Sequence, residues 1–133
     1  MAKYGSNSLS ITVEDSLAAA QDLSQYITEI NEVNVEALIE ESTAFGDDWV
    51  KNLAVGVKRG NPVTIGGFYD DVADGPDAVL KGIGDTREVV ITWGASKTTT
   101  FDAVITNYIR RPVRGELTKF ECVLTPTGAV TEA

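Results

Sequence analysis

The chain has 133 residues, of which 43% are hydrophobic and 23% charged, a composition that excludes wholesale disorder and suits one domain with its own core. No apolar run approaches the roughly 18 residues of a membrane span, and the first residues lack the blocks of a signal peptide, so we expect synthesis in the cytosol and no membrane anchoring. The net charge of −9 argues against tight binding to nucleic acid, which requires cations.

Alternation of apolar and polar residues predicts six or seven strands, and therefore a mainly β fold that forms a sandwich or a barrel-like sheet. The pattern is clear where Leu9, Ile11 and Val13 alternate with serine and threonine. Gly66 and Gly67 interrupt another strand and indicate a bulge or bend. The six clearest strands are expected at residues 9–13, 33–40, 63–69, 89–94, 98–109 and 119–124, the last stopped by Pro126.

Three further segments belong to the same predicted domain. A flanking helix, a long inter-strand loop and a flexible tail are expected at about residues 75–83, 40–61 and 127–133 of a single domain that covers residues 1–133. Pro76 suits the first position of the helix. The loop is long for a compact domain, and Phe45 and Trp49 argue against disorder, so we expect a functional loop. It should be mobile in a free subunit, because its aromatic side chains lack a partner.

The negative charge is concentrated in the first 50 residues, which contain ten acidic residues and one basic residue, Lys3. Glu40, Glu41, Asp47 and Asp48 lie within the predicted loop. Two such carboxylates at the right separation are the machinery of a glycosidase, but spacing along a loop does not establish that separation. A solvated or interface loop is the preferred interpretation, and a carboxylate-dependent hydrolase remains an alternative.

Other chemistry has little support in the sequence. The chain has no histidine, which removes the commonest general base and zinc ligand, and Cys122 alternates with apolar residues as a core residue does. The stretch YDDVADGPD resembles a calcium loop, but with Asp70 first, Val72 and Lys81 occupy ligand positions three and twelve. We therefore predict no enzymatic activity, no catalytic residue, no metal and no cofactor.

A basic cluster stands out in the second half of the chain. Arg110, Arg111 and Arg114 occur together in IRRPVR, which is more typical of a hairpin surface or an ion-pairing patch than of a phosphate site. Opposite potentials steer association and fix register between subunits. We expect these arginines to be an electrostatic counterpart of the acidic loop in a neighbouring copy.

Five stretches occur in a recognisable order: DLSQYITEI (22–30), ESTAFGDDW (41–49), VGVKRGNPVTIGGFYDD (55–71), GPDAVLKG (75–82) and RGELTKFECVLTPTGAV (114–130). The first looks like an Asp-x-Ser turn into a strand, and the second is similar to a Thr-x-Phe-Gly-Asp signature in a long loop. Over nearly its whole length the chain thus resembles the tail tube (major tail) proteins of long-tailed bacteriophages, which are related to the type VI secretion tube protein.

The resemblance implies a structural virion protein with the tail-tube fold, assembled in the host cytoplasm. Its copies would form hexameric rings that stack into a tube, filled first by a tape-measure protein and later crossed by DNA without specific binding. Its partners would be itself and other tail proteins, and another virion binding module, a decoration or tail-terminator protein, is the alternative. The expected ring-stacking residues are Glu40, Glu41, Thr43, Phe45, Gly46, Asp47, Asp48, Trp49, Lys58 and Arg59.

Overall fold

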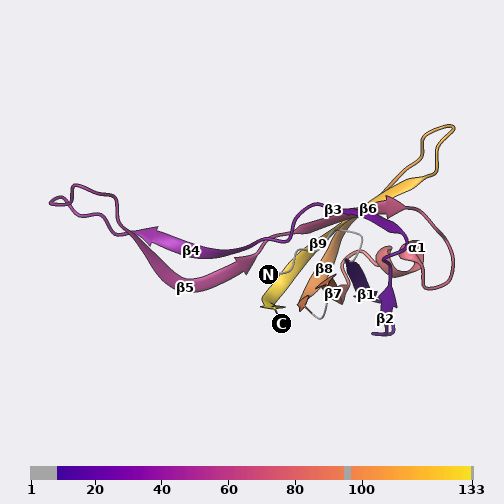
Figure 1. Cartoon of the computed structure of the whole chain (residues 1–133), viewed down its shortest axis with the longest axis horizontal. Coiled ribbons are helices and arrows are strands. Elements are labelled where there is room, and N and C mark those ends of the chain that lie inside the picture. Colours follow the sequence, from indigo (N-terminus) through magenta and orange to yellow (C-terminus); the bar gives the residue numbers. More distant parts are fainter. Residues whose placement is uncertain (1–8, 95–96, 133) are drawn as a thin grey trace.

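A single curled sheet forms the body of the molecule in the computed structural model, which describes residues 9–94 and 97–132 (Figure 1). Its seven strands are β1 (Ser10–Glu14), β2 (Ala20–Asp22), β3 (Ile27–Ile30), β6 (Val63–Phe68), β7 (Thr86–Gly94), β8 (Lys97–Arg111) and β9 (Lys119–Glu132). They are ordered β2-β1-β7-β8-β9-β6-β3, and each neighbouring pair is antiparallel. The sheet curls into a half-barrel, so the predicted mainly β, barrel-like fold is confirmed.

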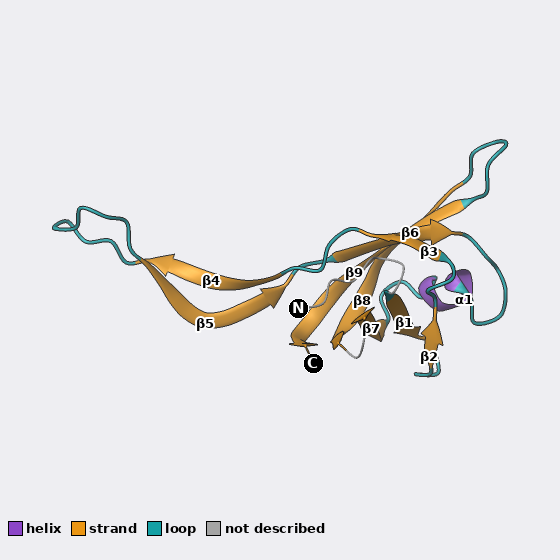
Figure 2. Ribbon diagram, viewed as in Figure 1, coloured by secondary structure: helices purple, strands orange, loops and turns teal. Residues whose placement is uncertain are grey.

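The core lies on the inner face of this half-barrel, where alternate residues of the strands point. The short helix α1 (Pro76–Leu80) covers one end of that face (Figure 2), and its Val79 and Leu80 are fully buried. The helix ends earlier than the predicted residue 83, and Gly84 follows at a φ of +89°. Among the described residues, no helix is long and apolar enough to cross a membrane. The buried apolar side chains of the sheet are Ile11, Val13, Val63, Ile65, Val89, Ile91, Phe101, Ala103, Ile105, Phe120, Cys122 and Leu124.

The two outermost strands of the sheet, β2 and β3, are joined by a link of only four residues, Leu23–Tyr26. The backbone N–H of Leu23 donates to the carbonyl of Ile11 at 3.1 Å, and the carbonyl of Tyr26 accepts from the N–H of Phe68 at 3.0 Å. The link therefore bonds to β1 on one side and to β6 on the other. This connection draws the two edges of the sheet together, and the predicted turn into a strand at residues 22–30 lies here.

A buried cation ties the helix to the sheet. The side chain of Arg87 on β7 is 4% exposed, and its Nη1 donates to the carbonyls of Glu14 at 2.8 Å and Val79 at 3.2 Å. Its Nη2 donates to the carboxylate of Asp85 at 2.9 Å. Because a buried charge is costly unless its hydrogen bonds are made, these partners specify how the end of β1, the helix and β7 meet.

The predicted loop at residues 40–61 is wrong, because half of it is strand. β4 (Val35–Glu41) and β5 (Asn52–Gly60) pair with each other in an antiparallel ribbon, and only residues 42–51 connect them. We call residues 35–60 the arm and residues 42–51 the tip loop. The arm projects away from the half-barrel (Figure 1). Three residues of β5, centred on Gly56 at a φ of +80°, oppose Leu38 of β4, and such a bulge bends a ribbon.

The predicted flexible tail is also wrong as a description of residues 127–132, which belong to β9. Thr131 pairs with Thr100 and Glu132 with Thr99 of β8. Pro126 does not end the strand, because the register shifts after it and residues 127–129 bulge opposite a single residue of β8. A bulge is one of the few places in a sheet that tolerate proline, which lacks the N–H of the ladder.

The glycine pair of β6 faces the bulge of a neighbouring strand. Gly67 pairs with Ile27 and Gly66 with Glu29, so β3 has one extra residue between these positions. A Cβ atom on Gly67 would lie 2.0 Å from the carbonyl oxygen of Tyr26, whereas one on Gly66 would lie 3.5 Å from its nearest neighbour, a carbonyl of β9. Of the two positions, only that of Gly67 requires glycine, because the backbone of Tyr26 lies too close for a Cβ atom.

We expect Gly67→Ala to lower the free energy of unfolding by about 1–3 kcal/mol, because the added methyl group forces the link between β2 and β3 away from β6. Gly66→Ala is the matched control and should change it by much less. Urea unfolding followed by tryptophan fluorescence measures both. Equal effects of the two substitutions would show that the close approach at Tyr26 does not limit stability.

Candidate assembly surface

The tip loop is closed by its own hydrogen bonds. The N–H of Ser42 donates to the carbonyl of Lys51 at 2.8 Å, and the N–H of Lys51 donates to Oγ1 of Thr43 at 2.9 Å. The carboxylate of Asp47 accepts from the N–H of Ala44 at 2.8 Å and lies 2.9 Å from Nζ of Lys51. The Ala44 amide, followed by Lys51, lowers the pKa of Asp47 below its ordinary value. These contacts argue against the mobility expected for a loop without a partner.

This closed loop presents two aromatic side chains to solvent. Phe45 is fully exposed and Trp49 is 83% exposed, although burying such a side chain would stabilise the molecule by about 1.5–3 kcal/mol. The signature residues Thr43 and Asp47 hold the loop, and Phe45 projects from it. The structure therefore places Phe45 and Trp49 outside the core, where only another molecule can cover them.

Apolar exposure continues along both strands of the arm, which the sequence interpretation did not foresee. Within residues 9–94 and 97–132, β4 and β5 pair with each other only, and nearly all their residues are exposed. The alternation in β4 predicted a half-buried strand, but its apolar side chains face solvent. The exposed large apolar residues of the arm, besides the two aromatics, are Val35, Leu38, Ile39, Val50, Leu53, Val55 and Val57.

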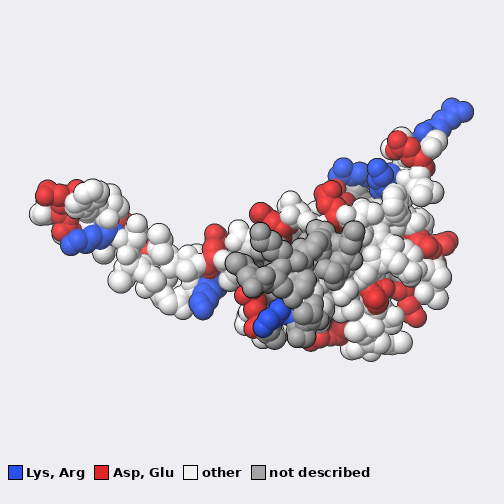
Figure 3. All heavy atoms as spheres, in the orientation of Figure 1, with Lys and Arg blue, Asp and Glu red and all other residues white. Residues whose placement is uncertain are grey.

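Charge is distributed unevenly along the arm. Asp and Glu gather with one basic group at its far end, and both acidic and basic side chains lie where it meets the body (Figure 3). Glu40, Glu41 and Asp48 are exposed near the tip. At the root, Arg59 forms an ion pair with Glu36 across the ribbon, and Lys58 is exposed. No ion pair of Lys58 or Asp48 occurs among the described residues.

The structure does not gather the three predicted arginines into one free patch. Nη2 of Arg110 lies 2.5 Å from a carboxylate oxygen of Asp77, and its guanidinium lies 4.8 Å from the ring centroid of Tyr108. Arg111 pairs with Glu121 at 2.8 Å, whereas Arg114 lies in the turn between β8 and β9. Hydrogen bonding to Asp77 raises the pKa of Arg110. Two of the arginines thus have partners within their own chain.

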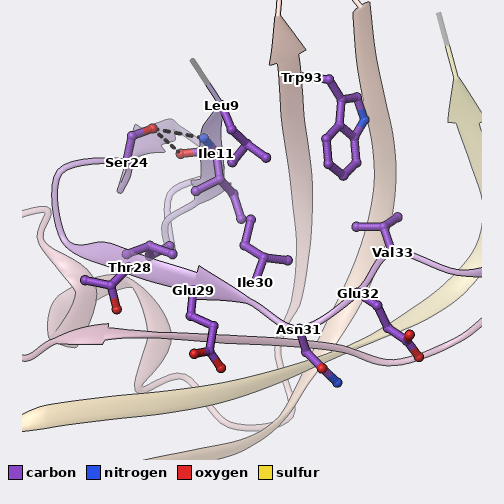
Figure 4. Close-up of a pocket in the computed structure, with 11 residues that line it drawn as sticks. Leu9, Ile11, Ser24, Thr28, Glu29, Ile30, Asn31, Glu32, Val33 and Trp93 are labelled. Carbon is purple, nitrogen blue, oxygen red and sulfur yellow. Dashed lines mark hydrogen bonds between the residues drawn. The ribbon is translucent and has the colours of Figure 1, made fainter. Parts of the chain in front are cut away.

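One groove lies between β3 and the end of β7 (Figure 4). Ile30 and Val33 point toward the space beside Trp93, whose Nε1 donates to Oγ1 of Thr99 at 2.7 Å. The carboxylates of Glu29 and Glu32 point away from this space (Figure 4). The groove is therefore apolar inside and acidic at its rim. It does not direct two carboxylates into the same space, as glycoside hydrolysis requires.

A second groove lies where the arm joins the body. It is walled on one side by the root of β5 and on the other by the bulged segment of β9. A Cβ atom on Gly60 would lie 2.8 Å from the side chain of Val130, so the arm approaches β9 closely beside the groove. We call this the root groove. Its lining residues are Val35, Gly56, Val57, Lys58, Arg59, Gly60, Pro126, Thr127, Gly128, Ala129 and Val130.

The single cysteine of the chain is not placed for chemistry. Cys122 is fully buried in the core, as its alternation predicted, and burial raises the pKa of its thiol to about 12. A thiol with so high a pKa is a poor nucleophile at neutral pH. Within residues 9–94 and 97–132, no cluster of three acids or cysteines is arranged to hold a metal ion.

Three solved structures with a similar fold come from gene transfer agent particles and a prophage baseplate. The chain is similar to one in the tail of an empty gene transfer agent particle, refined helically with C6 symmetry (TM-score 0.79, 17% identity, 99% of each chain). It is also similar to a chain of the native gene transfer agent virion (TM-score 0.76, 15% identity, 99% of each chain). A third match is the six-fold symmetrised anti-feeding prophage baseplate (TM-score 0.74, 12% identity, 100% of this chain and 97% of the other).

These likenesses cover the whole chain and show its fold. No protein-family model and no curated protein matches the sequence. The chain therefore has the tail-tube-like fold that the order of its motifs indicated, and that resemblance is confirmed. At 12–17% identity the shared property is the architecture, so the role of the arm has to be argued from its own residues.

We expect Thr43→Val to open the tip loop, because it removes the acceptor of the Lys51 N–H while keeping the shape of the side chain. Thr43→Ser keeps the hydroxyl and is the matched control. Hydrogen exchange of the Lys51 amide should speed up by about tenfold in the valine variant and remain near wild type in the serine variant. Fast exchange in the wild-type monomer would contradict a closed loop.

The hydrogen bonds that close the tip loop should also depend on pH. The pKa of Asp47 is lowered in the folded chain, so its contacts are fully present above the unfolded value of 3.8 and are lost as pH falls through the lower, folded value. We therefore expect the amide NMR signal of Ala44 to stay constant from pH 7 to 5 and to shift below 3.8. In Asp47→Asn this acid transition should be missing. A transition at higher pH would contradict the assigned contacts.

Proposed function

We propose that this chain is a structural protein of a virion tail that assembles with copies of itself into stacked hexameric rings, the tail tube through which DNA is delivered. The observation that carries the proposal is the arm, which extends an apolar, aromatic-tipped ribbon beyond the body. The shared fold with chains of assembled tail particles supports it. Tape-measure and other tail proteins would be the further partners, and the role is not catalytic.

The arm supplies the physical basis for assembly. Each exposed apolar side chain that enters a contact contributes by the area removed from water, and the arm offers nine large ones. A projection on one side of a subunit contacts a different surface on its neighbour, so the contact is heterologous. Heterologous contacts close into rings or continue along an axis, and a tube of stacked rings uses both.

The outer face of the main sheet suits the wall of a channel for DNA. Glu88 and Asp102 are directly opposite each other on β7 and β8, and Thr92 is opposite Thr98. From Thr86 to Thr92 and from Thr98 to Thr106, the outward positions of these paired strands carry hydroxyls, carboxylates and valines. Arg111 and Lys119 are opposite each other on the same face farther along β8, and Arg111 is paired with Glu121. The stretch between Thr86 and Thr106 offers phosphates no cation to hold, so DNA could pass it without specific binding.

A second role has some support. One of the matched chains belongs to a baseplate, so a component that forms one closed ring, such as a terminator or decoration protein, would use the same fold. It would bind a preformed lattice and would not extend by itself. The acids of the grooves give no comparable support to a hydrolase, because Glu29 and Glu32 point away from the groove that they border (Figure 4).

Electron microscopy of the purified protein at increasing concentration tests the proposal. We expect rings, and then tubes about 10 nm wide, from the size of six domains of this length. A closed oligomer of constant size would favour the terminator or decoration role. A monomer at every protein and salt concentration would contradict self-assembly.

We expect Phe45→Ala and Trp49→Ala to abolish tube formation without unfolding the subunit, because both side chains are exposed at the tip. Each should raise the protein concentration needed for assembly by at least about tenfold, as loss of a buried aromatic anchor does. Sedimentation measures assembly, and circular dichroism measures the fold. Leu17→Ala, at an equally exposed residue of the turn between β1 and β2, is the control and should assemble normally.

A further inference from the structure

We propose that the tip loop of one copy docks in the root groove of the next copy, with its aromatic side chains in the groove and Asp48 beside Lys58. The inference rests on the proposed self-assembly and names the contact that extends it. The tip loop lies at one end of the ribbon, and the root groove lies at the other end, between β5 and β9 of the body. A single chain therefore carries the projecting part and the receiving part.

The root groove has the shape and lining for an aromatic side chain. Its volume is about 720 Å³, within the range of roughly 300–1,000 Å³ that is usual for binding clefts. Val35 and Val57 are about half exposed in its wall, and Ala129 is exposed on the opposite side. The bulge of β9 forms that opposite side, so the groove lies at the junction between the arm and the body.

Charge favours this pairing. The tip carries Glu40, Glu41, Asp47 and Asp48, and its only nearby cation, Lys51, is bound to Asp47. The groove is lined by two cations, Lys58 and Arg59, of which Arg59 is already paired with Glu36. Lys58 is thus the cation that is left to meet a carboxylate of the tip, and the exposed Asp48 is next to Trp49. Opposite charges around an apolar contact set its orientation.

The same chain cannot make this contact with itself. β4 and β5 run the full length of the arm between the root and the tip, and seven strand residues span roughly 23 Å. Pairing between the strands from Val35–Gly60 to Glu41–Asn52 keeps the ribbon extended. The tip therefore reaches a root groove only in another copy. Each copy then inserts its tip loop into one neighbour and accepts the tip loop of another, so the contact repeats in one direction.

Two other surfaces fit the tip less well. The groove beside Trp93 is apolar, but Glu29 and Glu32 border it and would repel the acidic tip. Arg110 and Arg111 have carboxylate partners in their own chain, and Arg114 lies in the turn between β8 and β9, outside the lining of either groove. The root groove is the surface that combines apolar walls with a cation available to the tip.

Charge reversal tests the pairing in tubes made from the full chain. We expect Asp48→Lys and Lys58→Glu each to raise the concentration needed for assembly by about tenfold, and the double variant to return it to near the wild-type value. Lys81→Glu reverses an exposed charge of the helix cap and serves as the control. Arg114→Glu tests the competing surface.

Each result has one meaning. If wild-type protein forms tubes and both single variants assemble normally, or if the double variant stays defective, the contact is wrong while the proposed function stands. If only Arg114→Glu lost assembly, the tip loop would dock at the turn between β8 and β9 and not in the root groove. If wild-type protein forms no assembly at all, the proposed function itself fails.

A covalent measurement gives an independent answer. The only native cysteine is fully buried, so cysteines introduced by Asp48→Cys and Val57→Cys in one chain would be the reactive thiols. We expect mild oxidation of assembled tubes to join subunits into ladders on a denaturing gel, because a disulfide requires Cα atoms within about 7 Å. Leu17→Cys with Asp48→Cys is the control pair. Equal ladders from both pairs would overturn the contact.

Discussion

The four-residue link between β2 and β3 is the constraint on which the shape of this molecule depends. It connects the two ends of a seven-stranded sheet, so the sheet has to curl until Leu23 bonds to β1 and Tyr26 bonds to β6. Among the described residues β2 and β3 do not pair with each other, so the sheet remains a half-barrel. The next two strands, β4 and β5, pair with each other outside it and form the arm.

The body of the fold was predictable because its strands alternate and its inner face is buried. Ile11, Ile91 and Leu124 point inward as their spacing indicated. The arm was not predictable by the same argument, because a period of two identifies a strand but not whether a second layer covers it. Residues 52–60 were predicted as part of the loop, whereas in the structure they pair with β4 around a bulge at Gly56. The tail was missed because Pro126 also occupies a bulge.

The candidate surface was predictable in its residues and not in its geometry. Thr43, Phe45 and Asp47 are recognisable in one short motif, but which of them projects depends on hydrogen bonds that close the loop. The arginine cluster looked free because its acidic partners, Asp77 and Glu121, are distant in sequence or on another strand. The root groove combines segments near residues 57 and 128, and no local pattern relates them.

Stability and assembly are assigned to different parts of this chain. The half-barrel buries its core without help from the arm, so the subunit can fold before it meets a partner. The arm leaves its apolar residues exposed, and an exposed ribbon with free edges is an aggregation hazard unless another surface takes it up. In the proposed assembly, the acids at the tip would reduce that hazard, because they would repel the tips of other copies and favour a basic surface. Four of the ten acids in the first 50 residues, Glu40, Glu41, Asp47 and Asp48, would then serve the specificity of assembly.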